Sequence, residues 1–409
     1  MKFLHLADLH LGRSLHERSL QEDQRAFIQE IGSILGGDEW TGLILAGDIY
    51  DRSIPSKEAV ELLDELLALV HSRFPRLKIL MIPGNHDSSS RLSYGQGLFS
   101  RLGIHIAGDP EDSFEPLWIE EGSQRAACFL LPFLAPGSLR GELDTDAGGD
   151  PAPLGNQGDL HREAARRLEE ARRAAMEAGA DYTILVAHLF ATGGKESESE
   201  RRFLGTAELV DIRLYSGFDY VALGHLHRRQ QIAPNAWYAG SPLAWAFDEA
   251  GRQDSGAAAP EKGGIALSLG ESGLSISMVN IQPLHPLSRI TGTVDSFLRD
   301  PEWEKYRGHY LEIVLDGSEL VENALALLRQ RFPLLLSVKQ DRALETLAQT
   351  AGRRSQDLIK HAGEDLKSDF DAFLKALYGQ DHGRDEERAL FEALLEEAEQ
   401  ADRDEGSAV

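Results

Sequence analysis

Residues 79–87 read ILMIPGNHD, an apolar run that stops abruptly at three polar side chains, Asn85, His86 and Asp87. A short continuous apolar run is typical of a strand that is buried on both faces of a sheet. Four other apolar runs stop in the same way, and an Asp or a His follows each of them. The runs are residues 3–7, 43–46, 182–187 and 220–223, and the side chains after them are Asp8 and His10, Asp48, His188, and His225 and His227.

These five strand ends predict one shared site. In open α/β sheets, ligands bind at the edge formed by the carboxyl ends of the strands. We therefore expect the five polar clusters, although far apart in the sequence, to converge on one crevice. Further strands are expected at residues 126–131 and 237–239, and helices at residues 56–70, with Ser56 as the N-cap, and 160–178. Strands that alternate with helices predict an α/β fold in which central β-sheets are flanked by helices.

The chain is expected to contain more than one domain, because 409 residues exceed the usual size of a single domain. Strand patterns at residues 264–269 and 274–281 complete a first domain, residues 1–285. Residues 140–158 and 249–264 are rich in Gly and polar or charged residues, which predicts flexible surface loops.

Residues 286–342 predict a compact α+β module, with strands at 289–294, 310–315 and 334–339 and a helix at 318–331. From residue 343 to residue 409 the patterns are helical. A last helix is expected at residues 386–400, and its apolar residues share one side of the helix. These residues are Phe391, Leu394, Leu395 and Ala398.

The formal net charge of −25 bears on the partners of the chain. A free-standing nucleic-acid binder usually carries an excess of Lys and Arg, because phosphate contacts dominate its affinity. Either this chain does not bind nucleic acid, or divalent cations, a local basic surface or a partner subunit supply the positive field. Net charge alone leaves both alternatives open.

Other bulk features favour a cytoplasmic protein that is not bound to a membrane. No apolar run approaches the roughly 20 residues that span a bilayer. The first residues lead straight into a strand pattern and lack the long apolar segment of a secretion signal. The single cysteine, Cys128, excludes an intrachain disulfide.

The polar residue types fit a pair of divalent cations. Imidazole and carboxylate together suit Mn²⁺, Fe or Zn²⁺ better than Ca²⁺, which prefers oxygen ligands only. In the pairs Asp8-x-His10 and His225-x-His227, an extended backbone would project both side chains to the same face. Asp48 is the expected bridge between the cations, through its two carboxylate oxygens. The seven expected metal ligands are Asp8, His10, Asp48, Asn85, His188, His225 and His227.

Each motif alone also has an ordinary structural interpretation, because Gly, Asn and Asp favour turns and a lone His is often a core residue. Their joint occurrence, each after an apolar run, favours metal binding. Gly47, Gly84 and Gly224 beside the ligands are expected to allow sharp turns. No serine-hydrolase elbow or Walker-type loop is present. The other histidines lack a companion ligand and are expected not to bind metal: His5, His16, His71, His105, His161, His285, His309, His361 and His382.

The set Asp-x-His, Gly-Asp-x-x-Asp, Gly-Asn-His-Asp, His and Gly-His-x-His resembles the calcineurin-like metallophosphoesterase superfamily. Within it, the chain is similar to the SbcD family, the nuclease subunits of bacterial SbcCD complexes. The likeness covers residues 1–285 well and extends in layout through the module at 286–342. The stretches that carry it are MKFLHLADLHLG at 1–12, GDIYDRSIP at 47–55, SESER at 197–201, GSPL at 240–243 and FDE at 247–249.

The resemblance implies a layered metallophosphoesterase fold and two divalent metal ions, most often Mn²⁺. It assigns one cation to Asp8, His10, Asp48 and His227, and the other to Asp48, Asn85, His188 and His225. It also implies that His86 is a catalytic histidine beside the scissile phosphate, with Asp87 as the residue that orients it. Cations of this kind hold the phosphate and supply the attacking hydroxide.

The resemblance further implies a DNA nuclease, with double-strand exonuclease and single-strand endonuclease activity. Its partner would be an SbcC-type coiled-coil ATPase, bound by residues 343–409, and residues 286–342 would cap the DNA. Homodimers occur in the resembled family. A rival enzyme interpretation keeps the same cations for a small phosphoester as a stand-alone activity. A non-catalytic scaffold would lack ligands, and none is missing here.

Overall fold

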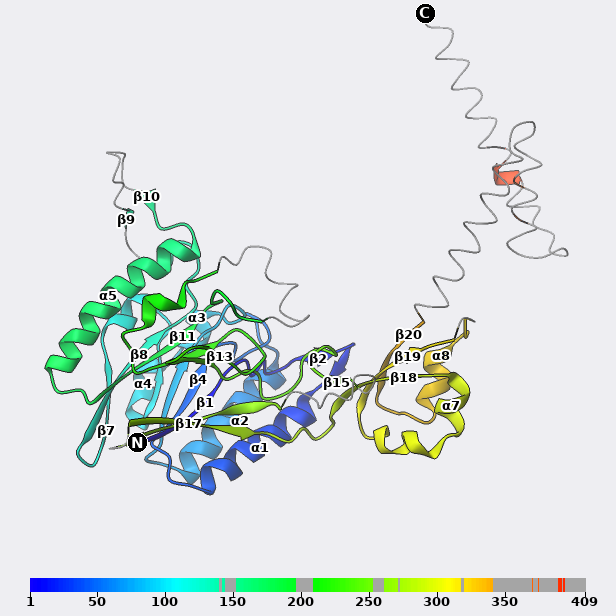
Figure 1. Ribbon diagram of the computed structural model, residues 1–409, viewed down its shortest axis with the longest axis horizontal. Helices are drawn as coiled ribbons and strands as arrows, with labels where there is room; N and C mark the ends of the chain where they lie inside the picture. Colours follow the sequence, from blue (N-terminus) through cyan, green and yellow to red (C-terminus); the bar gives the residue numbers. More distant parts are fainter. Residues whose placement is uncertain are drawn as a thin grey trace, which may run out of the picture. The chain divides into compact units, whose positions relative to one another are not determined.

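The computed structural model describes residues 1–139, 142–143, 152–195, 209–252, 261–270, 273–317 and 320–340, together with residues 370, 374, 389–391 and 393 (Figure 1). The larger of two compact units contains Met1–Thr291, Asp300–Ile313 and Leu325–Ser337, and the other unit contains the remaining segments. All the strand ends that carry the predicted ligands lie in the larger unit.

The first sheet of this unit has six strands in the order β17-β16-β1-β4-β5-β6. Strands β1, β4, β5 and β6 are parallel to one another, whereas β16 runs antiparallel to β1 and to β17. The parallel strands β1, β4 and β5 are almost completely buried, which explains their continuous apolar sequences. The bounds are β1 Lys2–Leu6, β4 Gly42–Ala46, β5 Lys78–Ile82, β6 Ile104–Ile106, β16 Gly263–Gly270 and β17 Gly273–Asn280.

The second sheet also has six strands, in the order β13-β14-β12-β11-β8-β7. Its central strands β8, β11, β12 and β14 are parallel, and the edge strands β7 and β13 are antiparallel to their neighbours. The bounds are β7 Leu117–Glu121, β8 Gln124–Leu131, β11 Tyr182–His188, β12 Tyr220–Gly224, β13 Gln230–Ala233 and β14 Ala236–Tyr238.

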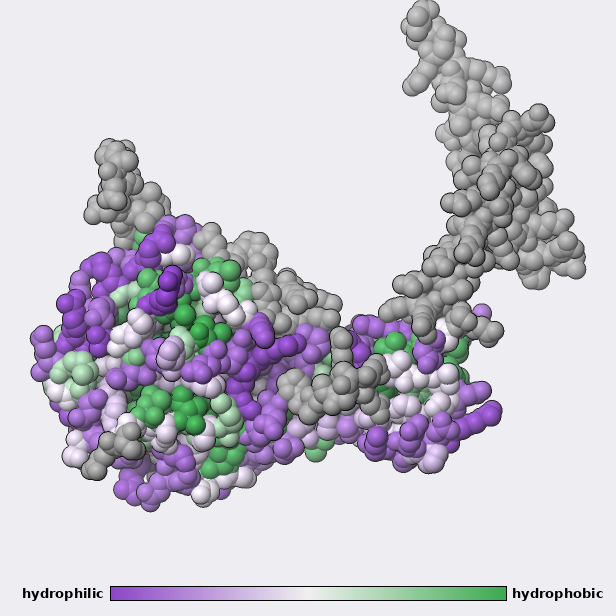
Figure 2. All heavy atoms as spheres, in the orientation of Figure 1, coloured by the Kyte–Doolittle hydropathy of each residue, from purple (hydrophilic) through white to green (hydrophobic). Residues whose placement is uncertain are grey.

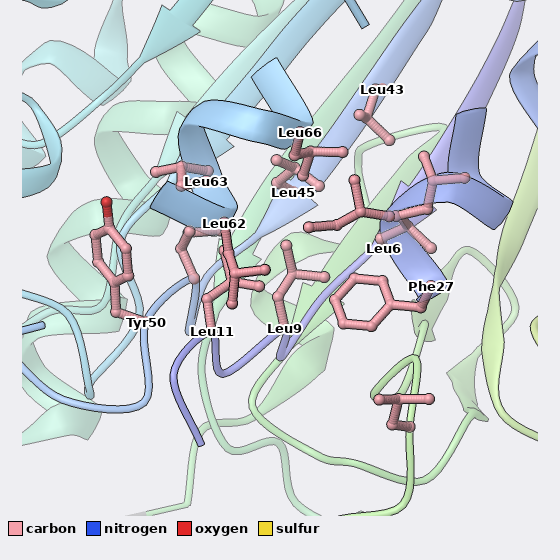
Figure 3. Packing of buried hydrophobic residues seen from close by; sticks show 14 of the residues in the cluster. Leu6, Leu9, Leu11, Phe27, Leu43, Leu45, Tyr50, Leu62, Leu63 and Leu66 are labelled. Atoms are coloured by element: carbon pink, nitrogen blue, oxygen red, sulfur yellow. The ribbon is translucent and has the colours of Figure 1, made fainter. Parts of the chain in front are cut away.

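Helices cover the outer face of each sheet. Helices α1 (Gln21–Gly36) and α2 (Lys57–Arg73) share an apolar cluster with the first sheet, in which Leu66 of α2 lies beside Leu45 of β4 (Figure 3). Helix α5 (Gln157–Glu177) buries its apolar side on the second sheet, and its exposed side carries ion pairs between arginine and glutamate. The surface in this region is mainly hydrophilic in Figure 2.

The inner faces of the two sheets pack against each other. Ile44 and Leu80 of the first sheet belong to the same buried cluster as Cys128 and Ile184 of the second. Strands β4 and β5 contact β11, β4 contacts β12 and β5 contacts β8, so the layers follow in the order helix, sheet, sheet, helix. The predicted α/β fold, with central sheets flanked by helices, is therefore confirmed.

The remaining elements are short. In the larger unit they include the hairpin β2–β3, and a further sheet has the order β15-β18-β19-β20. Their bounds are β2 Ser14–Leu15, β3 Arg18–Ser19, α3 Ser89–Leu92, α4 Gln96–Phe99, η1 Ser100–Leu102, η2 Pro110–Phe114, β9 Glu142–Leu143, β10 Ala152–Pro153, η4 Ile212–Tyr215, β15 Gly251–Arg252, β18 Leu287–Gly292, α7 Val294–Arg299, η6 Pro301–Tyr306, β19 Tyr310–Leu315, α8 Ala324–Arg329 and β20 Leu335–Lys339.

Three local expectations need correction. The helix expected at residues 318–331 is only six residues long among the described residues, because α8 covers Ala324–Arg329. The loop expected at residues 140–158 ends earlier, since Asn156 caps α5 by accepting a hydrogen bond from the amide of Asp159. The loop expected at residues 249–264 begins with a buried residue, Glu249. Residues 253–260 within it lie outside the described residues.

Most of the predicted helical region at residues 343–409 also lies outside the described residues. Among the described positions there, the rings of Phe370 and Phe391 stack with their centroids 3.9 Å apart. The described helices include none with both the length and the apolar character that crossing a bilayer requires.

Candidate metal centre

The predicted ligands meet where the carboxyl ends of the two sheets come together. Strands β1, β4 and β5 of the first sheet lead into the segments that carry Asp8, Asp48 and Asn85. Strands β11 and β12 of the second sheet end at His188 and just before His225. The sequence predicted convergence on the edge of an open sheet, whereas in the structure the ligands come from the strand ends of two sheets that pack face to face.

The segments after β1 and β4 are held together by backbone hydrogen bonds. The amides of Asp8 and His10 donate to the carbonyl oxygens of Gly47 and Asp48, at 3.0 Å in both cases. Asp8, His10 and Asp48 all have positive φ angles, of 55°, 42° and 49°. The extended backbone predicted for Asp8-x-His10 is therefore wrong, and left-handed residues of this kind are typical of functional sites.

Glycines allow the close approach of these segments. A Cβ atom on Gly224 would lie 1.8 Å from the carbonyl oxygen of Ala46, and one on Gly84 would lie 2.1 Å from Oδ1 of Asp48. Gly47, with a φ of +87°, occupies a turn that L side chains disfavour. The expected sharp turn is thus present at Gly47, while Gly84 and Gly224 are needed because the backbone of one segment touches another.

One group of ligand atoms gathers around Asn85. Its Oδ1 lies 3.0 Å from Nε2 of His188 and 3.0 Å from Nδ1 of His225. Nδ1 of His188 lies 2.9 Å from the carbonyl oxygen of Ala46, which can only accept, so this nitrogen donates and Nε2 of the neutral ring keeps its lone pair. Oδ1 of Asn85 therefore lies about 3 Å from one ring nitrogen of each histidine, a spacing that fits shared ligation of one cation.

A second group forms around His10. Its Nε2 lies 3.1 Å from Nε2 of His227 and 3.7 Å from Oδ2 of Asp48. Ligand atoms bound to one ion at about 2.1 Å and at right angles lie about 3 Å apart, so both groups have the spacing of a metal shell. The buried Oδ2 of Asp8 has no hydrogen-bond partner among the described residues, although such atoms usually have one.

Asp48 lies between the two groups. Its Oδ2 is 3.7 Å from Nε2 of His10 and 3.5 Å from Nε2 of His188, while its Oδ1 accepts a hydrogen bond of 2.9 Å from the amide of His86. The same oxygen therefore faces both groups. Asp48 is the residue that would be shared by the two ligand groups if cations were bound.

The buried carboxylates of the site also favour a positive charge beside them. Burial, partly offset by His188 and His227, raises the pKa of the Asp8 carboxyl to about 6. Burial opposes the charged form of His188, but the carboxylates of Asp48 and Asp8 outweigh it and raise the pKa of that imidazole to about 9. Positive charge beside Asp48 is thus favoured. Carboxylate, amide and imidazole donors in this arrangement fit divalent metal ions.

His86 adjoins this centre. One of its ring nitrogens lies within 4.8 Å of ligand atoms of His10 and Asp48. Its Nδ1 lies 2.9 Å from the carbonyl oxygen of Asp51 and donates to it, which leaves Nε2 as the second nitrogen of the ring.

Asp87 contacts the loop backbone around the centre. Its carboxylate accepts hydrogen bonds from the amides of Ile49, Tyr50 and Gly84, at 2.9, 2.8 and 2.9 Å. The residue is 9% exposed. Asp87 therefore ties the segment after β4 to the segment after β5, and the acceptor for the ring of His86 is Asp51 rather than Asp87.

Two residues behind the site were not predicted from the sequence. Glu249 is buried, and its Oε1 lies 3.3 Å from Nδ1 of His227. Its other carboxylate oxygen, Oε2, lies 2.5 Å from Nζ of Lys262. Burial alone would raise the pKa of Glu249, but the charges of Lys262 and His227 hold it well below its usual range. Both residues fall in the segment predicted to be a flexible loop.

Two of the other histidines are buried in the core, away from the ligand groups. Nδ1 of His5 pairs with the hydroxyl of Tyr220 at 3.0 Å, and Nδ1 of His161 pairs with the hydroxyl of Tyr215 at 2.6 Å. Burial lowers the pKa of both imidazoles to about 3, so both are neutral. His361 and His382 lie outside the described residues.

The chain is similar to known proteins over most of its length. A family model described as calcineurin-like phosphoesterase matches residues 1–229. A protein of Staphylococcus epidermidis, named as the SbcD component of the nuclease SbcCD, is 30% identical over 342 residues, which cover 83% of this chain and 85% of that protein. The protein of the same name from Staphylococcus saprophyticus is 29% identical over 340 residues, which cover 83% and 84%.

Likeness to solved structures is looser. The crystal structure of TT1561 of Thermus thermophilus matches 69% of this chain and 99% of its own chain, with 11% identity and a TM-score of 0.35. A putative 5′-nucleotidase from Staphylococcus aureus matches 80% of this chain and 57% of its own, with 12% identity and a TM-score of 0.36.

Proposed function

This chain belongs to the calcineurin-like phosphoesterase family, and from that premise we propose that it is a metal-dependent DNA nuclease. It cuts phosphodiester bonds as the nuclease subunit of an SbcCD-type complex, as an exonuclease on double strands and an endonuclease on single strands. The observation that carries this proposal is the pair of ligand groups that share Oδ2 of Asp48. The alternative, a small phosphoester as the substrate, would use the same centre.

The extent of the sequence likeness supports DNA over a small ester. The family match ends at residue 229, and the first domain predicted from the sequence ends at residue 285. The two SbcD relatives align over 340 and 342 residues, so their likeness must continue into the module predicted at residues 286–342. The likeness to these two relatives thus extends beyond the part that matches the phosphoesterase family model, which supports the DNA substrate.

Two divalent cations, which we propose to be Mn²⁺, fit the donor atoms of the centre. Asp8, His10, Asp48 and His227 would hold one cation, and Asp48, Asn85, His188 and His225 would hold the other. When bound, such cations polarise the phosphate and make a nucleophile available from water at neutral pH. Gly84 and Gly224 keep the two ligand groups close together, because a side chain at either position would push the segments apart.

In this proposal, His86 donates a proton to the leaving oxygen. Its Nδ1 donates to the carbonyl oxygen of Asp51 at 2.9 Å, so the orientation of the ring is set and Nε2 is the atom that carries the mobile proton. A histidine in this role typically contributes about 10²–10⁴ in rate. Asp87 is a positioning residue, since it holds the loop that carries His86 through backbone amides.

The other parts of the chain have roles that follow from the same proposal. Residues 1–285 form the nuclease domain, residues 286–342 form a DNA-capping module, and residues 343–409 bind a coiled-coil ATPase. A net charge of −25 is unfavourable for binding DNA by the isolated chain. The cations and the basic surface of a partner subunit would supply the missing positive field. Homodimer formation belongs to the same proposal.

The substrate class is tested by incubating the metal-free chain with linear duplex DNA and with p-nitrophenyl phosphate, each with and without Mn²⁺. We expect Mn²⁺-dependent shortening of the DNA, loss of that activity with EDTA, and little turnover of the small ester. Gel electrophoresis and the absorbance of released p-nitrophenolate measure the two reactions. Rapid turnover of the ester without any nicking of DNA would instead establish the small-substrate alternative.

The partner proposal is tested by co-purification of the chain with a candidate SbcC-type ATPase, before and after deletion of residues 380–409. The deletion removes the apolar side that the sequence predicts on the last helix, so we expect at least a tenfold loss of complex. The metal content of the shortened chain serves as the control, because the metal centre lies in the first domain. Unchanged binding after the deletion would exclude this helix as the contact.

A further inference from the structure

Glu249 is a buried carboxylate in direct contact with a ligand of the proposed metal centre. Its side chain is 0% exposed, and Oε1 lies 3.3 Å from Nδ1 of His227. The other oxygen, Oε2, lies 3.3 Å from the amide of Trp245 and 2.5 Å from Nζ of Lys262. Burying a carboxylate is unfavourable unless charge and hydrogen bonds compensate it, so this arrangement is unlike an incidental surface contact.

Lys262 connects three segments around this carboxylate. In addition to Glu249, its Nζ donates to the carbonyl oxygen of His227 at 2.9 Å and to Oγ of Ser241 at 2.9 Å. The lysine side chain is 10% exposed. Lys262 therefore holds the backbone of His227, while Glu249 contacts the ring of the same histidine.

The contact decides which nitrogen of His227 carries the hydrogen and which one faces the ligand group around His10. A carboxylate accepts, so Nδ1 of His227 carries the hydrogen and Nε2 keeps its lone pair, 3.1 Å from Nε2 of His10. In His188 the same task falls to a neutral backbone carbonyl, that of Ala46. A charged acceptor makes the imidazole a stronger donor to a metal than a neutral one does.

We propose that Glu249, held in place by Lys262, is a positioning residue that fixes the ring of His227 and strengthens its bond to the cation shared with His10. This proposal rests on the metal centre of the proposed function and adds to it residues outside the predicted set of seven ligands. It also gives a role to the ends of the segment 249–264, which converge on His227 although the sequence predicts a loop there.

The test measures metal binding rather than catalysis. Metal-free full-length chain and its Glu249→Gln variant are titrated with Mn²⁺ by isothermal calorimetry. Gln keeps the size of the side chain and removes the charge. Loss of a partner of this kind typically weakens metal affinity by about 10–100-fold, and we expect this loss at one of the two sites only, because His227 belongs to one ligand group.

Glu312→Gln is the matched control. Glu312 is also a buried glutamate, 3% exposed, and it pairs with Arg289 and with the hydroxyl of Ser337 in the sheet that contains β18 and β19. Its loss should lower the melting temperature without changing either Mn²⁺ affinity. If Glu249→Gln leaves both affinities within about twofold, or if both variants weaken them equally, the positioning role is refuted.

A second variant covers the case in which Glu249→Gln does not fold, as judged by circular dichroism of the metal-free protein. Glu249→Asp keeps the charge but withdraws the carboxylate from His227, so the same one-site loss is expected and the same criteria apply. The result is independent of the substrate. A chain that binds two cations but cuts no DNA would refute the nuclease proposal and leave the role of Glu249 intact.

Discussion

Asp48→Asn is expected to remove both cations at once and to slow phosphodiester cleavage by at least about 10³-fold, the equivalent of several kcal/mol of lost transition-state stabilisation. Oδ2 of Asp48 faces Nε2 of His10 at 3.7 Å and Nε2 of His188 at 3.5 Å. The Asn side chain has the same shape as that of Asp, and its oxygen can still accept the hydrogen bond from the backbone amide of His86. It removes the negative charge that both ligand groups share.

Metal analysis of the purified variant measures this prediction directly, with cleavage of linear duplex DNA as the second readout. Asp23→Asn is a suitable control, because Asp23 is another buried aspartate, 2% exposed, whose partners are Tyr310 and His285. The control should retain both cations. If the Asp48 variant also retained two Mn²⁺ per chain after gel filtration, Asp48 would not be the shared ligand.

The ligand set could be predicted because the end of a buried strand is recognisable in the local sequence. Strands β4 and β5 are buried on both faces, so their sequences are continuously apolar and the first polar residue after each is conspicuous. All seven predicted ligands lie in one of the two groups or next to them. Their roles as ligands remain proposals that metal binding has to test.

The three-dimensional arrangement of those strand ends cannot be recognised in the local sequence. The pattern predicts strands but does not say that β11 and β12 belong to a different sheet from β1 and β4, since pairing joins residues far apart in the chain. The left-handed backbone at Asp8 and His10 is likewise set by hydrogen bonds to the segment after β4. Tertiary contacts of this kind override the local preference for extended backbone.

The residues behind the ligands were missed for a related reason. Glu249 and Lys262 stand at the two ends of a stretch that is rich in Gly, Ala and polar residues, which favours a solvated loop. The signal for Glu249 is the FDE sequence at 247–249, which is part of the family resemblance, and no comparable signal marks Lys262. A buried charge pair is recognised from contacts, and contacts are not visible in composition.

Acidic side chains are also concentrated at the metal centre. Asp8, Asp48, Asp87 and Glu249 place four buried carboxylates at or directly beside the ligand groups. Lys262 compensates Glu249 directly, whereas Asp8 and Asp48 lie beside the imidazole of His188, whose pKa their charges raise to about 9. Binding of divalent cations would therefore relieve repulsion within the folded chain as well as prepare it for a phosphate.

His86→Ala is expected to slow cleavage of DNA by about 10²–10⁴-fold while metal content stays near that of the parent chain. The reason is the placement of the ring, whose Nδ1 donates to the carbonyl oxygen of Asp51 and whose proposed task is proton donation rather than coordination. His71→Ala, in the last turn of α2, is the control and should leave both quantities unchanged.

A change of leaving group separates proton donation from general damage to the centre. Bis(p-nitrophenyl) phosphate releases a phenolate that needs little help from an acid, so its Mn²⁺-dependent hydrolysis should fall far less in the His86 variant than cleavage of DNA does. Equal losses with both substrates would contradict an acid role. Loss of the cations themselves would make His86 a ligand, which its closeness to His10 and Asp48 permits geometrically, and would require the metal assignment to be redrawn.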